Sequence, residues 1–75
     1  MVKPSAAQVK LLRYLRTAEA SGLSADVILR REERTYIACV RRGWVRRVGY
    51  SSLGNIRAAL TDAGRAALEE GHGNV

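Results

Sequence analysis

The sequence WVRRVGYSSLGNIRAAL, residues 44–60, decides the fold. Its first seven residues are rich in β-branched and aromatic types, which favour a strand over a helix. Residues 51–55 are turn-forming types, and residues 56–60 can return as a second strand, although Ala58 and Ala59 weaken that signal. We therefore predict a β-hairpin with strands at 44–50 and 56–60. Trp44 is expected in the core, where it would seal the hairpin against the rest of the chain.

An amphipathic helix of about four turns is predicted near the N-terminus. Residues 5–8, SAAQ, read as a capping box, because the Ser5 hydroxyl can accept from the backbone of Gln8 while Gln8 reaches back. Gly22 supplies the left-handed position that ends the helix. Its apolar stripe is Val9, Leu12 and Leu15, with Leu11 widening it.

Two more helical patterns lie between Gly22 and the hairpin. Ser24 is a candidate N-cap for a short helix with residues 27–29 as its apolar body. Val27 and Ile28 also suit a strand, and only the cap and the length of the segment favour a helix. Residues 32–42 form the third helix, which Gly43 ends, although residues 30–32 contain no side chain typical of a cap. Its apolar face is Tyr36, Ile37 and Val40, with Cys39 beside them, and its opposite face is Arg34, Thr35, Ala38, Arg41 and Arg42.

A last helix is predicted after the hairpin, with Thr61 as its N-cap and Asp62 near the helix dipole. Gly71 is expected to end it. Residues 1–4 are predicted to be a disordered lead and residues 71–75 a flexible tail, which leaves one domain over residues 5–70. The helix carries a face of small residues formed by Ala63, Ala66, Ala67 and Leu68.

The predicted fold is mainly α with a small β-hairpin: a three-helix core, the two-stranded hairpin and a C-terminal helix. The hairpin and the last helix would cover the open side of the core with Val45, Leu60 and Leu68. The helical core residues are Val9, Leu12, Leu15, Val27, Ile28, Ile37 and Val40.

The charge is concentrated in one third of the chain. The 75 residues hold 13 Lys and Arg against seven Asp and Glu, a net charge of +6. Residues 30–57 hold eight arginines and only Glu32 and Glu33 as anions, so the whole excess lies there. Clustered arginine is expected of a protein that binds a polyanion. The alternative, a solvated surface that keeps the protein soluble, would more often be spread evenly and use lysine, so we favour nucleic acid.

Several classes of protein are disfavoured by the composition. No apolar run approaches the length of a membrane span, and the N-terminus lacks the hydrophobic stretch of a secretion signal, so we expect a cytoplasmic protein. Cys39 is the only cysteine and is expected to be a buried apolar residue. No metal-ligand spacing, phosphate loop or nucleophile–base pair is recognisable. We therefore expect no enzymatic activity, no cofactor and no small-molecule ligand.

Two strings resemble a known family. Residues 41–45, RRGWV, look like the "RRGLV" step at which many bacterial winged-helix regulators pass from the recognition helix to the wing. Residues 60–68, LTDAGRAAL, are similar to the "LTxxGRxAL" string that follows the wing in MarR-like and PadR-like regulators. The strings lie one hairpin apart, and the resemblance covers residues 5–70. It implies a winged helix-turn-helix domain and a role as a small transcriptional regulator that binds duplex DNA.

The resemblance also implies where DNA would lie. The third helix, about 32–42, would enter the major groove, and the arginine-rich wing would lie on the backbone or in the minor groove. The major-groove candidates are Arg34, Thr35, Ala38 and Arg41, although these arginines could instead touch only phosphates or water. The candidates for the backbone and the wing are Arg30, Arg31, Arg42, Arg46, Arg47, Tyr50, Asn55 and Arg57.

Other partners fit the same basic face. Winged helices also serve as protein-interaction modules, for example as inhibitors or adaptors encoded by mobile elements, and an acidic partner would use the same arginines. Structured RNA is a third candidate partner. A single winged helix reads a short site, so a homodimer on a two-fold site is an expected arrangement. The first helix and the alanine-rich last helix offer dimer faces, although those alanines could equally pack inward.

Overall fold

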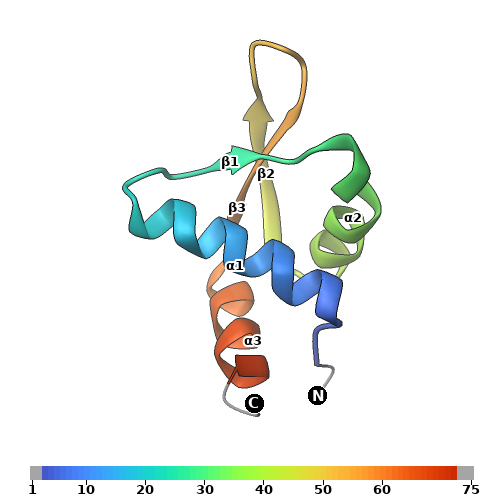
Figure 1. Ribbon diagram of the computed structural model, residues 1–75, viewed down its shortest axis with the longest axis vertical. Coiled ribbons are helices and arrows are strands. Elements are labelled where there is room, and N and C mark those ends of the chain that lie inside the picture. The colour runs from blue at the N-terminus through green and yellow to red at the C-terminus, as the bar shows by residue number, and fades with distance from the viewer. Residues whose placement is uncertain (1–2, 73–75) are drawn as a thin grey trace.

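A computed structural model describes residues 3–72 (Figure 1). Within these residues the chain forms three α-helices, α1 (Ala6–Ala20), α2 (Glu33–Arg41) and α3 (Asp62–His72), and a single 3₁₀ turn, η1 (Arg30–Glu32). Three strands, β1 (Asp26–Val27), β2 (Val45–Tyr50) and β3 (Ile56–Leu60), form one antiparallel sheet in the order β1-β3-β2. The fold is therefore α+β. The prediction of a mainly α fold is confirmed only in part, because a third strand replaces one of the predicted helices.

Helix α1 begins and ends as its sequence predicts. The Ser5 hydroxyl accepts from the Gln8 amide at 3.2 Å, and the Gln8 side chain accepts from the Ser5 amide at 2.8 Å, which confirms the capping box. The helix ends just before Gly22, whose φ of +92° is the left-handed conformation that favours glycine. Leu11, Leu12 and Leu15 are buried, and Val9 packs against the core from a half-buried position.

The predicted second helix is absent, and strand β1 occupies its place. Asp26 pairs with Ala58 and Val27 with Arg57, about thirty residues away along the chain. The Tyr14 hydroxyl of α1 donates to the Val27 carbonyl at 3.0 Å, which fixes β1 to α1 as well. Burial raises the pKa of Tyr14 to about 12. Pairing with the edge of β3 satisfies the backbone that a two-turn helix would have left largely unbonded at its ends.

The turn η1 leads into α2 without a conventional cap. The Glu32 carboxylate instead accepts from the Leu29 amide at 3.2 Å, which stabilises the turn. Helix α2 buries Tyr36 and Cys39. Ile37 and Val40 were predicted to be in the core, but they are 42% and 40% exposed. The helix is therefore rotated about its axis relative to the prediction.

The hairpin has the predicted strands, and β3 matches residues 56–60 at both ends. Val45 pairs with Leu60, Arg47 with Ala58 and Tyr50 with Ile56, and a bulge lies between Arg47 and Gly49. The turn projects beyond the rest of the molecule at the top of Figure 1. At the tip, the Ser51 hydroxyl accepts from the Asn55 amide at 3.1 Å, and Gly54 has a φ of +83°.

Helix α3 starts at its predicted cap, because the Thr61 hydroxyl accepts from the Gly64 amide at 3.0 Å. One detail of the prediction was wrong, because the helix continues through Gly71 to His72 instead of ending at Gly71. Of the two alternatives for the alanines, Ala63 and Ala66 are exposed, whereas Ala67 packs inward with Leu68. Residues 1–2 of the predicted lead and 73–75 of the predicted tail lie outside the described residues.

The core forms where α1 and α2 meet the sheet and α3. Trp44 is buried as predicted, and Val45, Leu60 and Leu68 close the core as predicted. Val27 is only half-buried, since it lies on the sheet face turned away from this core. The core consists of Leu11, Leu12, Leu15, Ile28, Tyr36, Cys39, Trp44, Val45, Ala58, Leu60, Ala67 and Leu68.

Candidate nucleic-acid interface

The eight arginines of residues 30–57 are distributed over η1, α2, β2 and β3. Seven are exposed and one, Arg57, is half-buried. The first two, Arg30 and Arg31, lie in η1, and the next two, Arg34 and Arg41, lie in α2. Arg42 is the C-cap residue of α2, Arg46 and Arg47 lie on β2, and Arg57 lies on β3.

The outward face of α2 combines two arginines with small and aliphatic side chains. Arg34, Ile37, Ala38 and Arg41 have the spacing i, i+3, i+4, i+7 and so share one side of the helix. That side lies away from the buried Tyr36, and on it Arg34, Ile37 and Arg41 are exposed while Ala38 is half-buried. Of the predicted major-groove residues, Arg34, Ala38 and Arg41 lie there, whereas Thr35 is half-buried at the edge near α1. Sequence reasoning missed Ile37 because it assigned this aliphatic side chain to the core.

The register of the hairpin divides its arginines between two faces. Residues paired across antiparallel strands share a face, so Arg47 and Tyr50 lie on the same face as the buried Val45. Arg46 pairs with Ala59 on the opposite face, where Arg57 also lies opposite Gly49. Arg46 borders a hollow together with Asp62 and Arg65 at the start of α3. Only Arg47 among the hairpin arginines therefore shares the sheet face on which α2 packs.

Arg47 and Tyr50 hold each other on that face. The Arg47 Nη1 donates to the Tyr50 hydroxyl at 2.7 Å, and the guanidinium carbon lies 5.3 Å from the centre of the Tyr50 ring. Burial raises the pKa of Tyr36 on α2, and the positive charge of Arg47 opposes that rise. Helix α2 is in contact with β2, so this part of the hairpin lies beside the helix.

Hollows border α2 on both sides. One of about 450 Å³ lies between α1 and η1 and is lined by Lys10, Arg31 and Thr35, among others. A second of about 350 Å³ lies between the start of α2 and the hairpin, where Arg30 and Glu33 face Tyr50 and Asn55. The predicted wing residues Tyr50 and Asn55 are therefore brought next to the predicted backbone residue Arg30.

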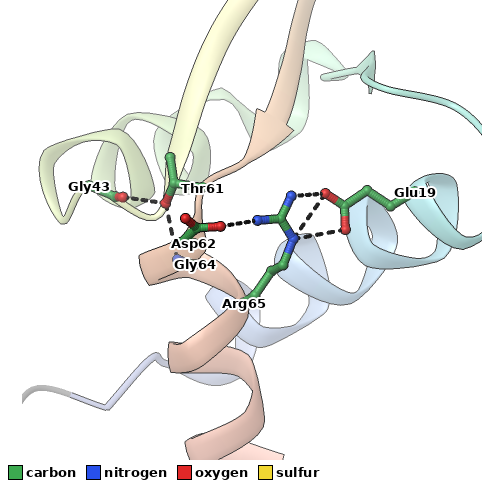
Figure 2. Close-up of polar contacts among 6 residues, drawn as sticks. All are labelled: Glu19, Gly43, Thr61, Asp62, Gly64 and Arg65. Atoms are coloured by element: carbon green, nitrogen blue, oxygen red, sulfur yellow. Dashed lines mark hydrogen bonds and ion pairs between the residues drawn. The ribbon is translucent and has the colours of Figure 1, made fainter.

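Among the described side chains, none of the eight arginines forms an ion pair with a carboxylate. Arg65, in contrast, contacts both Glu19 and Asp62 (Figure 2). Glu32, one of the two anions near the arginines, already accepts from the Leu29 amide. The guanidinium groups around α2 therefore keep most of their hydrogen-bond donors directed toward solvent.

The rest of the described chain offers little other site chemistry. The side chains that the structure describes include no group of three or more His, Cys, Asp or Glu residues arranged to hold a metal ion. Cys39 is buried as predicted, and burial raises the pKa of its thiol to about 11. In the same part of the chain, each helix is too short or too polar to cross a membrane.

Comparisons with protein-family models, with curated proteins and with solved structures found no match to this chain.

Proposed function

We propose that this protein is a small transcriptional regulator that binds duplex DNA, with α2 in the major groove and the β2–β3 hairpin along the backbone. The observation that carries the proposal is the set of exposed arginines around the outward face of α2 that have no carboxylate partners. Each such guanidinium that neutralises a phosphate releases condensed counterions, which favours binding. In this proposal the phosphates of the DNA neutralise the positive charge of these arginines.

The outward face of α2 has the dimensions and the chemistry for reading base pairs. Arg34 and Arg41 lie seven residues apart, about 10 Å along the helix axis, which spans about three base-pair steps. A guanidinium in the major groove can donate two hydrogen bonds to one guanine. Arg34 is assigned to such a contact. Arg41 and Arg42 lie at the C-terminal end of α2, where phosphate contacts are favoured.

The hairpin adds a second contact beside the helix. Arg47 is positioned by Tyr50 and lies on the α2 side of the sheet, where it can reach a backbone phosphate. We include the winged-helix fold in this proposal, with β1 and η1 in the place of the second of its three helices. Arg46 and Arg57 lie on the other sheet face and are assigned no primary contact.

A gel shift with random-sequence duplex DNA at low salt tests the proposal. We expect binding whose logarithm of affinity falls linearly with the logarithm of salt concentration. Arg47→Ala should weaken binding to all sequences about equally, because a phosphate contact carries no sequence information. Arg46→Ala is the matched control, since it removes the same charge from the adjacent residue on the opposite face. Equal losses from both variants would contradict the assigned geometry.

A second candidate is an acidic protein partner bound to the same surface. The exposed apolar side chains near the arginines favour it: Tyr50 is 58% exposed and Leu53, at the tip of the hairpin, is 88% exposed. The gel shift separates the two candidates. Absence of binding to duplex DNA at low salt would contradict the first proposal and favour the protein partner, and competition between duplex DNA and RNA would reveal a preference for RNA.

A further inference from the structure

We infer that Ile37 is a specificity-determining residue, whose side chain contacts the C5-methyl group of thymine in the major groove. This inference rests on the proposed function and deepens it, because it names a feature of the DNA sequence that the protein would prefer. That feature is an A·T pair beside the base pair that Arg34 contacts.

The placement of Ile37 is the first observation. It lies about 4.5 Å along the axis from Arg34 and about 6 Å from Arg41, on the same outward side of α2. Its side chain is 42% exposed and does not belong to the core. A DNA duplex that contacts both arginines on the outward side of α2 would therefore also contact Ile37.

The chemistry of the Ile37 side chain limits which base it would contact favourably. The major-groove edge of thymine presents a methyl group beside an acceptor oxygen, and the other three bases present only polar groups there. An aliphatic side chain gains free energy by burying that methyl group, and it leaves the polar edges of guanine or cytosine unsatisfied. Ala38, on the same side of the helix, is shorter and half-buried. Ile37 is thus the apolar side chain of this face with the longest reach.

Val40 provides a matched comparison on the same helix. It is 40% exposed, almost the same as Ile37, but it lies on the flank of α2 and outside the Arg34–Arg41 stripe. Truncation of either side chain removes a similar exposed aliphatic surface. A general effect of lost apolar surface would appear in both variants, whereas recognition of a thymine methyl group would be lost only with Ile37.

The test uses duplexes selected by the wild-type protein from a random library. The strongest binder is resynthesised with deoxyuridine in place of each thymidine in turn, which removes one methyl group and nothing else. We expect wild-type affinity to fall about fourfold at one or two positions, the effect of burying one methyl group. Ile37→Ala should bind the thymidine and deoxyuridine duplexes equally at those positions. Val40→Ala should keep the wild-type difference.

The outcomes separate this inference from the function on which it rests. If the wild-type protein binds no duplex at low salt, the proposed function fails and the inference fails with it. If it binds DNA but discriminates against no deoxyuridine duplex, or if Ile37→Ala still discriminates, only the inference is overturned. A fall in molecular mass on Ile37→Ala, measured by light scattering, would also overturn it, because a second copy of the chain would then be what covers Ile37.

Discussion

Arginine has opposite surroundings in two regions of this molecule. On α3, Arg65 contacts Glu19 of α1 and Asp62 of its own helix, so its charge is neutralised within the protein. Around α2 and the hairpin, eight arginines contact no carboxylate among the described side chains. Residues 30–57 carry the entire net charge of +6, and the remainder of the chain sums to zero. The comparison shows that the arginine of the first region joins two helices of the fold, whereas the arginines of the second region are mostly exposed to solvent.

The two regions also differ in packing, because the first is tightly packed and the second is exposed. At the base of the hairpin, the Thr61 hydroxyl contacts both the Gly43 carbonyl and the Gly64 amide (Figure 2). Gly64 is buried against the backbone of Trp44, with no room for a side chain. The outward face of α2, in contrast, leaves Ile37 and both of its arginines exposed. Substitutions in the first region should therefore change stability, and substitutions in the second should change affinity.

The largest expected effect is on stability, at the base of the hairpin. A Cβ atom added at residue 64 would lie far inside the van der Waals contact distance of the Trp44 carbonyl oxygen. Because that oxygen belongs to the backbone, it cannot move aside as the end of a flexible side chain could. Gly64→Ala should therefore lower the free energy of unfolding by about 3 kcal/mol or more, measured by urea denaturation. Ala66→Ser, at an exposed position of the same helix, should change it by less than about 1 kcal/mol. A stable Gly64→Ala variant would show that this contact is not tight.

The second prediction concerns the outward face of α2. Arg34→Glu should reduce affinity for duplex DNA at least tenfold, because one guanidinium–guanine contact contributes about 1–3 kcal/mol. Its melting temperature should not fall, since Arg34 has no carboxylate partner to lose. Arg16→Glu makes the same change in net charge beside α3. If both variants lost the same affinity, net charge alone would account for binding, and the distinction between the two regions would disappear.

The third prediction concerns the hydroxyl group that joins α3 to the turn after α2. Thr61→Val removes the acceptor for the Gly64 amide and the donor to the Gly43 carbonyl while keeping the shape of the side chain. The free energy of unfolding should fall by about 1 kcal/mol, the usual value of a helix N-cap. Thr17→Val, at an exposed position of α1, is the control and should have almost no effect. An unchanged midpoint of thermal unfolding for Thr61→Val would argue against the cap.

The smallest effect is expected from the ion pair and depends on pH. The hydrogen bond from Arg65 holds the pKa of Glu19 below its usual value. Its stabilisation should therefore be present above the pKa of the unfolded chain, near 4.5, and be lost as pH falls through the lower pKa of the folded state. Glu19→Gln should lower the melting temperature by roughly 2–4 °C at pH 7. The difference from the wild-type protein should shrink as pH falls below 4.5 and vanish once Glu19 is protonated in the folded state.

Glu33→Gln serves as the control for this pH dependence. Glu33 is exposed and makes no ion pair among the described side chains, so its substitution should leave the pH profile of the melting temperature unchanged. A constant difference between Glu19→Gln and the wild-type protein from pH 7 to pH 3 would mean that the Glu19–Arg65 contact contributes no electrostatic stability.

The elements that the sequence predicted correctly are those governed by local chemistry. The capping box at Ser5, the cap at Thr61 and the left-handed Gly22 each act within a few residues, and each is present in the structure. The hairpin strands also follow from residue types and from the turn between them. These signals were sufficient because the interactions that they describe close within one turn of the chain.

The elements that the sequence did not predict depend on distant partners. The cap at Ser24 favoured a helix over the strand that Val27 and Ile28 also suit, but the backbone of Asp26 and Val27 pairs with β3, a partner that local patterns do not identify. In α2, the Tyr36–Cys39 side and the Ile37–Val40 side are both apolar enough to face a core. Only the packing of α2 against the sheet and α1 decides between them. This packing also determines the candidate site, because it leaves Ile37 on the outward face and not in the core.

The hydrogen bonds of the Thr61 hydroxyl affect how the protein would bind a partner. It links the last turn of α2, through Gly43, to the first turn of α3, at the point where β3 ends. The placement of α2 relative to the hairpin is therefore set before a partner arrives. The backbone of this surface then has little conformational entropy to lose on association, although the exposed arginine side chains still have to be ordered. Its bound and free forms should have nearly the same backbone.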